Sequence, residues 1–342
     1  MAYTDIDKPT DYFETKLYTG NGGTQSITGL DFQPNWVWIK RRNGAESHAL
    51  FDSVRGVQKQ LASDATGVEE TVSTSLTAFG SDGFTVGAYS RVNASSDTFV
   101  SWNWKAGGSS STNTDGNLDT TVSVNATAGF SIVKYVGEQS ATQTFGHGLN
   151  AVPKMILIKK LNNSSSDWVV YHEAITSANR LKLNTTDASA SSPNWRATPT
   201  NTVFNSNSSN IINNSGDSYI AYCFAEKQGY SKFGSYVGNG SENGVFCFTG
   251  MKVGWLMIKR TDSANSWIIM DNKRTTFNPM GEELKAEVSD AGNDATRWDF
   301  LSNGFKLRNG SGAVNASGGS YIYMAFAENP FTTSSGVPAT AR

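Results

Sequence analysis

Two aspartates close equivalent apolar runs of the sequence and are the first residues to consider for acid–base chemistry. Asp52 ends the run 48–52 and Asp271 ends the run 267–271, whereas the matching run between them ends in His172. Polysaccharide hydrolysis requires paired carboxyl groups, which sandwich-fold hydrolases place on one strand face with the spacing Glu-x-Asp-x-x-Glu. The sequence lacks that spacing. We therefore interpret both aspartates as caps of strand-end turns and predict a protein that is not an enzyme and has no catalytic residues.

Histidine is a common metal ligand, and the chain has three histidines, His48, His147 and His172. A metal site needs ligands that converge at a defined spacing. The three histidines occupy non-equivalent positions and show no such spacing, so we interpret them as solvated or strand-end residues. We predict neither a metal site nor a cofactor.

Two acidic segments, 115–119 and 290–294, resemble fragments of calcium-binding loops. The first reads Asp-x-Asn-x-Asp, but Thr120 stands where such a loop needs glycine and Ala126 where it needs glutamate. We interpret both segments as polar connections, and the sequence leaves open whether either binds an ion. The Gly-Asn-Gly at 20–22 leads into no helix, so it predicts a tight turn rather than a phosphate-binding loop.

Two tryptophans outside the apolar runs, Trp195 and Trp298, are the best candidates for a ligand contact. Aromatic rings stack against the apolar faces of sugars while neighbouring amides hold the hydroxyl groups. Trp195 stands between Asn194 and Arg196, and Trp298 precedes Asp299. We predict that Trp195, Arg196 and Trp298 form an exposed contact, with a subunit interface preferred over a glycan. Tryptophans that recur inside apolar runs are predicted to pack in the core.

One pattern occurs three times along the chain, and this repetition determines the architecture. Each copy opens with Tyr-x-Gly, continues with an apolar run closed by lysine and a second apolar run, and ends in an aromatic-rich strand. The closing strand begins 59, 60 and 62 residues after the lysine in the three copies. The tyrosines are Tyr18, Tyr135 and Tyr236, the lysines are Lys40, Lys159 and Lys259, and the closing strands begin at Phe99, Tyr219 and Tyr321.

Composition excludes several classes of function. The 342 residues carry a net charge of −2 with 17% charged residues, so no basic surface for nucleic acid is indicated. No apolar stretch is long enough to cross a membrane and no signal peptide is evident, so we expect a soluble protein made in the cytoplasm without membrane insertion. Two cysteines, Cys223 and Cys247, are too few for a disulfide framework and are interpreted as buried free thiols.

The fold class that these patterns predict is all-β. Apolar runs of four to eight residues, rich in aromatic and β-branched side chains, alternate with Gly, Asn, Ser and Asp turns. We predict three tandem antiparallel β-sandwich units of about 100 residues, of jelly-roll type, in which the opening and closing strands pair. The predicted divisions are an N-terminal arm (1–11), unit 1 (12–106), a flexible linker (107–127), unit 2 (128–228), unit 3 (229–329) and a C-terminal tail (330–342).

Both faces of the predicted strands carry large side chains. The runs at 36–39, 155–158 and 255–258 are apolar at every position, which is typical of a strand covered on both sides. In the closing strand of unit 3, Tyr321 and Tyr323 share one face, while Met324 shares the other with further large residues. We therefore expect an inner core face and an outer face that meets a neighbouring unit or chain.

With these motifs in hand, the chain resembles a group of repeat-containing virion proteins from phages of marine bacteria. The resemblance rests on Trp-Val-Trp-Ile-Lys at 36–40, Phe-Asp-Ser-Val-Arg-Gly at 51–56, Ser-Asp-Gly-Phe at 81–84 and Trp-Asn-Trp-Lys-Ala-Gly-Gly at 102–108. It is specific over unit 1 and looser over units 2 and 3, which lack the Ser-Val-Arg-Gly. The resemblance implies concanavalin-like or laminin-G-like sandwiches and a component of the virus particle, and it supplies no catalytic residues.

The expected function is that of a non-enzymatic virion structural protein on the particle exterior, either a capsid decoration or a tail-associated accessory. Its expected partners are other virion proteins and further copies of itself, with 1–11 and 330–342 acting as docking arms. The alternative is a tail-fibre-type receptor-binding adhesin that recognises host surface glycans through the Asn/Ser/Thr-rich loops of unit 2. A polysaccharide depolymerase is disfavoured by the missing carboxylate pair.

Overall fold

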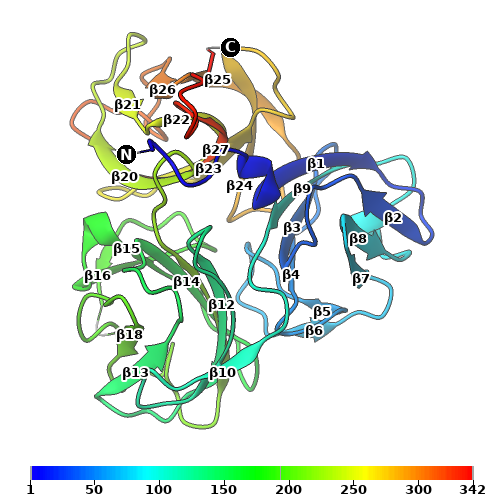
Figure 1. Cartoon of the computed structure of the whole chain (residues 1–342), viewed down its shortest axis with the longest axis vertical. Coiled ribbons are helices and arrows are strands. Elements are labelled where there is room, and N and C mark those ends of the chain that lie inside the picture. Colours follow the sequence, from blue (N-terminus) through cyan, green and yellow to red (C-terminus); the bar gives the residue numbers. More distant parts are fainter. Residues whose placement is uncertain (1, 193, 341–342) are drawn as a thin grey trace.

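The computed structural model of the chain describes residues 2–192 and 194–340, which form three lobes around a common centre (Figure 1). Within these residues, helical structure is confined to the four-residue α1 (Ser90–Asn93) and the 3-10 turns η1 (Pro9–Asp11) and η2 (Glu173–Ile175). The rest of the regular structure is antiparallel strand, so the predicted all-β class is confirmed.

Each lobe corresponds to one sequence repeat, here called repeat 1 (12–106), repeat 2 (107–228) and repeat 3 (229–330). Repeat 1 contains β1 (Phe13–Thr19), β2 (Gln25–Thr28), β3 (Trp36–Arg41), β4 (Ala49–Asp52), β5 (Lys59–Gln60), β6 (Glu70–Thr71), β7 (Leu76–Gly80), β8 (Gly83–Val86) and β9 (Thr98–Trp104). Repeat 2 contains β10 (Ser111–Asn113), β11 (Thr120–Asn125), β12 (Phe130–Val136), β13 (Gln143–Gly146), β14 (Met155–Lys160), β15 (Val169–His172), β16 (Asn179–Lys182), β17 (Ala190–Ser191), β18 (Val203–Ser206) and β19 (Ser218–Phe224). Repeat 3 contains β20 (Ser231–Val237), β21 (Phe246–Phe248), β22 (Met251–Arg260), β23 (Trp267–Asp271), β24 (Met280–Lys285), β25 (Asn293–Leu301), β26 (Gly304–Leu307) and β27 (Ser320–Pro330).

The same strand order recurs in all three repeats. The orders β1-β9-β3-β4, β12-β19-β14-β15 and β20-β27-β22-β23 each pair the opening strand with the closing strand. The pairing places the opening tyrosine of each repeat against the first aromatic residue of its closing strand, with ring centroids 5.0–5.1 Å apart and nearly parallel rings. These pairs are Tyr18–Phe99, Tyr135–Tyr219 and Tyr236–Tyr321. The landmark residues therefore set the strand register, while jelly-roll connectivity remains a prediction.

The buried apolar side chains of the described residues form one cluster inside each repeat and a fourth cluster shared by all three. Strand β3 shows how one run serves two clusters, because Trp36 and Trp38 enter the shared cluster while Val37 and Ile39 enter that of repeat 1. In the shared cluster, Trp36 stacks on Tyr222 of repeat 2 with centroids 4.4 Å apart. The expected outer face is thus the wall of a common core, which explains why these runs lack polar alternation.

The predicted flexible linker at 107–127 is part of the repeat 2 sheet, and that prediction was wrong. Strand β11 lies within it and pairs along β12, with Val122 opposite Val133. Val122 is buried in the cluster of repeat 2. The Ser-, Thr- and Asn-rich composition concealed a strand whose apolar residues, Val122 and Val124, alternate on one face.

The predicted docking arms pack against the protein's own third repeat. The Tyr3 hydroxyl donates to the carbonyl of Gly250 at 2.7 Å, and Ile6 is buried in the shared cluster. The C-terminal segment joins this arm, because the amide of Ser334 donates to the Asp7 carboxylate at 2.6 Å. The arms are therefore a strap over repeat 3 within the described residues, whereas Met1, Ala341 and Arg342, which the sequence analysis assigned to them, lie outside those residues.

A matched pair of substitutions on β14 tests whether the shared cluster couples the repeats. Leu157 faces the shared cluster and Ile158 faces the repeat 2 cluster. We expect Leu157→Ala and Ile158→Ala each to lower the free energy of unfolding by about 2–5 kcal/mol. Hydrogen exchange should then rise in β3 and β22 as well as β14 for Leu157→Ala, but mainly in repeat 2 for Ile158→Ala. Exchange confined to repeat 2 in both variants would show three independent domains.

Candidate functional site in the contacts between repeats

The lysines that close the first apolar runs are buried at the junctions between repeats. Each ammonium group donates a hydrogen bond to a backbone carbonyl of the preceding repeat. The repeats form a closed ring, so the lysine of repeat 1 contacts repeat 3. The three contacts are Lys40 Nζ to Ser289 O at 3.1 Å, Lys159 Nζ to Thr66 O at 3.0 Å and Lys259 Nζ to Thr186 O at 3.2 Å. Each lysine also donates to a carbonyl of its own repeat, so it ties two chain segments together.

Burial gives these lysines an unusual charge state without making them reactive groups. Removal from water lowers the pKa of Lys40, Lys159 and Lys259 to about 8. A depressed lysine pKa is one mark of a nucleophilic amine. Here, however, all three side chains are fully buried and their amines bind carbonyl oxygens. Their repetition at three equivalent junctions indicates a structural role.

Backbone hydrogen bonds reinforce each junction in the same threefold pattern. The segment after each lysine pairs with the loop that the lysine reaches, as a short bridge between repeats. The bonds are Gly292 N to Arg42 O at 2.8 Å, Glu69 N to Leu161 O at 3.0 Å and Ser189 N to Thr261 O at 2.8 Å. Such bonds satisfy loop groups that would otherwise be buried without partners.

A second ring of polar contacts uses the residue that begins the second apolar run. At this position repeat 1 has histidine and the other repeats have tryptophan, and each ring N–H donates to the equivalent carbonyl of the preceding repeat. The contacts are His48 Nε2 to Lys285 O at 2.9 Å, Trp168 Nε1 to Ala62 O at 2.8 Å and Trp267 Nε1 to Lys182 O at 2.9 Å.

The two aspartates cap turns, as predicted, and they also form buried ion pairs. Asp52 accepts the backbone N–H groups of Val54 and Arg55 and pairs with the Arg55 guanidinium. Asp271 binds the backbone and guanidinium of Arg274 in the same way, with Arg274 Nε 2.6 Å from the carboxylate. Arg274 therefore fills the role of Arg55, although repeat 3 lacks the Ser-Val-Arg-Gly that identified repeat 1.

Each of these carboxylates also accepts a hydrogen bond from the next repeat. The Tyr222 hydroxyl donates to Asp52 at 2.7 Å, and the Trp102 indole donates to Asp271 at 2.9 Å. Burial raises the pKa of Tyr222 well above its ordinary value, so the phenol stays protonated and can donate. The carboxylates are thus fully occupied by protein donors, unlike those of a general acid or base, which must reach a substrate.

Repeat 2 departs from this arrangement, and its neighbour departs with it. His172 occupies the aspartate position, and the equivalent of Tyr222 and Trp102 in repeat 3 is Met324, which has no strong donor. The His172 Nε2 lies 3.3 Å from the backbone carbonyl of Tyr323 instead. Repeats 1 and 3 therefore carry an aspartate where the next repeat supplies a hydrogen-bond donor. Repeat 2 carries the donor His172 where the next repeat supplies a carbonyl acceptor.

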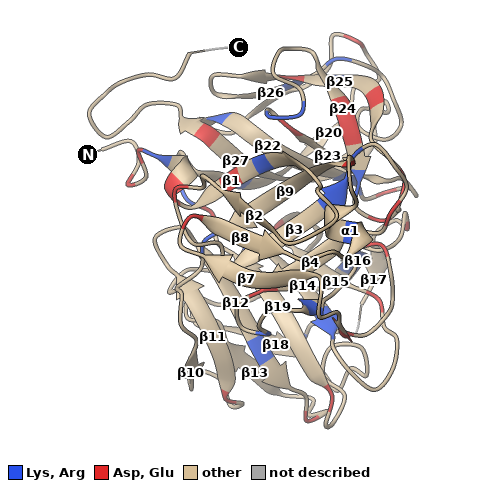
Figure 2. Ribbon diagram, turned by 90° about the vertical axis from the view of Figure 1, so that its right-hand side faces the viewer, with Lys and Arg blue, Asp and Glu red and all other residues tan. Residues whose placement is uncertain are grey.

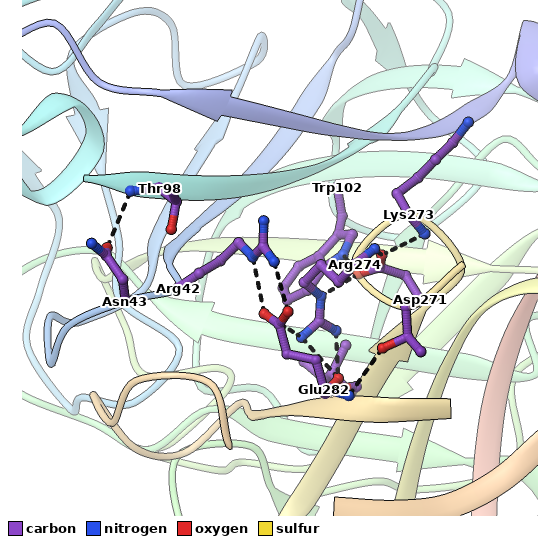
Figure 3. A network of polar contacts seen from close by, with 10 residues as sticks. Arg42, Asn43, Thr98, Trp102, Asp271, Lys273, Arg274 and Glu282 are labelled. Carbon is purple, nitrogen blue, oxygen red and sulfur yellow. Dashed lines mark hydrogen bonds and ion pairs between the residues drawn. The ribbon is translucent and has the colours of Figure 1, made fainter. Parts of the chain in front are cut away.

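A charged network crosses the junction between repeats 1 and 3 (Figure 3). Arg42 binds Glu282 in a two-pronged ion pair, with Nε 2.9 Å from Oε1 and Nη2 2.6 Å from Oε2. The hydrogen bonds that Arg42 donates to the Glu282 carboxylate raise the pKa of Arg42. Arg274 Nη1 lies 3.8 Å from the same carboxylate and links it to Asp271. Alternating charge in this network neutralises each carboxylate and leaves no free acid.

All three histidines are buried rather than solvated, and each lies at or directly beside the end of a strand, which was the other alternative in the prediction. In each ring, Nδ1 accepts an N–H and Nε2 lies within hydrogen-bond distance of a carbonyl, which fixes the neutral tautomer with the proton on Nε2. Burial lowers the pKa of His48 to about 3 and that of His147 and His172 to about 4. Both nitrogens are engaged, so these rings bind protein groups rather than a metal.

The predicted ligand contact does not form, because both tryptophans are buried. Trp195 is 4% exposed and packs edge-on against Tyr171, and Trp298 is fully buried within β25. Arg196 alone is exposed, and Pro193 of the same stretch lies outside the described residues. The polar neighbours suggested loops, but the loop after β17 folds inward and places Trp195 in the repeat 2 cluster.

The other predicted features also have structural explanations. Asp115 and Asn117 belong to a turn against β13, and Asn293 and Asp294 begin β25. No group of three or more His, Cys, Asp or Glu side chains suitable for a metal occurs among the described residues. Cys223 and Cys247 are buried free thiols, as predicted.

Two open hollows flank the turn at 126–127. One, of about 550 Å³, is lined by the N-terminal strap and by Lys227 and Gln228, and the other, of about 460 Å³, by Gln33, Asn35 and Lys105 among others. Asp5 is the carboxylate among the residues that line the first hollow. Neither hollow is lined by the two carboxyl groups that acid–base hydrolysis of a polysaccharide needs.

The helices of the described residues are too short to span a membrane. Charged side chains of both signs are sparse and intermixed along the ribbon in the view of Figure 2. This distribution agrees with the net charge of −2 and offers no basic stripe in that view.

Comparison with known proteins places this architecture in a family. The model of a domain of unknown function, DUF7483, matches residues 8–330, and the chain belongs to that family. The match includes all three repeats and the junctions between them. No curated protein and no solved structure matches the chain.

Substitution of the buried carboxylate at the junction of Figure 3 should destabilise the whole protein. Asp271→Asn leaves Arg274 buried without its counter-charge, and we expect a loss of about 3–5 kcal/mol in the free energy of unfolding. Asp299→Asn breaks the partly exposed pair with Arg308 and should cost about 0–1 kcal/mol. Urea denaturation of both variants measures the difference, and equal small losses would show that the network does not hold the repeats.

The buried histidines predict loss of stability in mild acid. Their folded pKa lies below the ordinary value of about 6.5, so the unfolded chain binds protons that the folded chain refuses between pH 6.5 and about 4. Lowering the pH from 6.5 to 5 should therefore reduce the free energy of unfolding by about 2 kcal/mol for each histidine. Chemical denaturation at both pH values tests this, and His172→Asn should remove about a third of the histidine contribution to the slope. An unchanged slope would contradict the burial of the neutral ring.

Proposed function

We propose that the protein is a non-enzymatic structural component on the exterior of a bacteriophage particle, as a capsid decoration or a tail-associated accessory. The proposal rests on the observation that the buried polar and charged side chains bind other parts of the protein. The buried lysines, aspartates, arginines and histidines described above bind atoms of a neighbouring repeat or of their own repeat. These groups stabilise a rigid body of three lobes and are not arranged around a substrate.

The sequence supports the particle assignment through its resemblance to repeat-containing virion proteins. A rigid body with repeated lobes suits a component that is present in many copies, because each lobe offers the same type of surface at a fixed angle. The proposed partners are other virion proteins and further copies of the chain. The proposed location is the virion, after synthesis in the host cytoplasm.

The alternative function, adhesion to host glycans, rests on the Asn/Ser/Thr-rich loops of unit 2, and it loses the aromatic contact that the sequence suggested. Its aromatic platform was Trp195 and Trp298, and both indoles are buried. Arg196 by itself offers charge but no stacking surface for a sugar ring. We therefore prefer the structural role.

Localisation on purified particles tests the proposal directly. We expect quantitative mass spectrometry of gradient-purified particles to find the protein at many copies, and antibody gold-labelling of intact particles to mark their outside. The matched control is a known cytoplasmic phage protein that sediments away from particles. Recovery of the chain only in the soluble lysate fraction would overturn the proposal.

Turnover assays test the non-enzymatic part separately. Purified protein incubated with host surface polysaccharide should release no reducing ends above the level of a heat-denatured sample. Release that survives in an Asp52→Asn variant but depends on another carboxylate would reveal a catalytic site elsewhere. Any such turnover would contradict the structural role.

A further inference from the structure

The three repeats differ at the edge formed by the first two strands of each repeat. These strands are β1 and β2 in repeat 1, β12 and β13 in repeat 2, and β20 and β21 in repeat 3. In repeat 2 this side is covered by residues 113–125 of the segment between repeats. The N-terminal part of that segment meets β13, and its C-terminal part pairs with β12 as β11. One extended segment therefore covers the edges of both sheets.

The contacts of this segment define what fits such an edge. Thr121 and Ser123 of β11 stand opposite Lys134 and Ile132 of β12, while Val122 enters the core. At the other edge, the amide of Leu118 donates to the carbonyl of Thr144 at 3.3 Å. The segment combines main-chain pairing with apolar side chains at alternate positions.

Repeat 3 has the same edge without such a cover among the described residues. Only residues 225–230 connect β19 to β20, and this connection is too short to supply a covering strand like β11. The amide of Phe233 donates to the Glu226 carboxylate at 3.3 Å, away from β27. Because outward groups alternate along an antiparallel strand, the N–H and C=O of Ser235 also point away from the sheet. Ser235 occupies the position of Lys134, which β11 pairs in repeat 2.

The neighbouring strand of repeat 3 adds an apolar surface that the other repeats lack. Phe246 and Phe248 on β21 are 44% and 57% exposed. The equivalent residues are Ser26 and Thr28 in repeat 1 and Thr144 and Gly146 in repeat 2, as the pairing of each strand with its neighbour shows. Val237, at the end of β20, is 60% exposed, and its counterpart in repeat 2, Val136, is 50% exposed, so the phenylalanines make the difference between the repeats. Exposed aromatic residues on an edge strand mark a surface that another chain covers.

We propose that the open side of repeat 3, defined by Ser235, Val237, Phe246 and Phe248, binds an extended segment of a different protein as an added strand. The segment has the chemistry of residues 113–125, with apolar residues at alternate positions and Thr or Ser between them. In Figure 1, β20 and β21 lie at the outer rim of their lobe, where a partner can approach.

The occupant comes from another protein because the described segments of this chain are already engaged. Among the described residues, neither the strap nor the C-terminal segment pairs with β20 or β21; the Tyr3 hydroxyl binds the Gly250 carbonyl, and the Ser334 amide binds the Asp7 carboxylate. Residues 113–125 are paired within repeat 2. Symmetric pairing of two β20 edges would extend one sheet but would leave the phenylalanines of β21 uncovered.

Peptide binding to the full chain tests the proposal. The probe is a fluorescent peptide with the sequence of residues 113–125, followed by anisotropy. We expect saturable binding, loss of binding for the peptide with Val122→Pro, and an affinity at least about tenfold weaker for protein carrying Phe246→Thr and Phe248→Gly. Ser235→Pro should weaken binding similarly, because it removes an outward N–H.

The matched control is Phe277→Ser, which removes a 77% exposed phenylalanine outside β20 and β21 and should leave binding unchanged. Circular dichroism in the near ultraviolet verifies that each variant is folded. Absence of binding at about 1 mM peptide, or equal binding to all variants, would overturn the proposal. So would a concentration-dependent dimer in sedimentation that Phe246→Thr and Phe248→Gly abolish, because a second copy would then be the occupant.

Discussion

Both faces of the main sheet are buried in every repeat, and the other features of the structure follow from this burial. A sandwich normally turns one face of each sheet toward its own core and the other toward water. Here the second face of each main sheet turns toward the common centre, where Trp36, Tyr222 and Trp255 belong to one cluster. The hydrophobic effect thus fixes the repeats around a centre, since a lobe that moved away would expose this apolar face.

The apolar centre also determines where the polar groups must go. Loop carbonyls at the junctions are removed from water and need donors, which the buried lysines supply at three equivalent places. Removing lysine from water is unfavourable, as the lowered pKa of Lys40 shows. The two hydrogen bonds of each lysine compensate for part of this loss and make the junction geometry specific, because carbonyls accept in defined directions.

Divergence among the repeats follows their contacts. Asp52 and Asp271 face donors of the next repeat, and His172 faces a repeat that offers Met324 and a carbonyl. A buried carboxylate without a donor would be strongly destabilising, so the acceptor and donor positions change together. By contrast, the open edge of repeat 3 differs through exposed Phe246 and Phe248, where no internal partner constrains the side chain.

The all-β class, the three repeats and the pairing of the opening with the closing strand could be predicted from the sequence alone, because recurring tyrosines, lysines and apolar runs are local signals of period and pairing. The sequence also indicated a second buried face, since runs such as 36–39 lack polar alternation. It could not show that the lysines cross to another repeat, because each lysine and its carbonyl partner are far apart in the chain. Nor could it separate the buried Trp195 from an exposed one, since polar neighbours are equally typical of a surface loop and of a loop that folds inward. Which groups meet depends on the folded arrangement, because the ring of repeats brings together residues that share no local pattern.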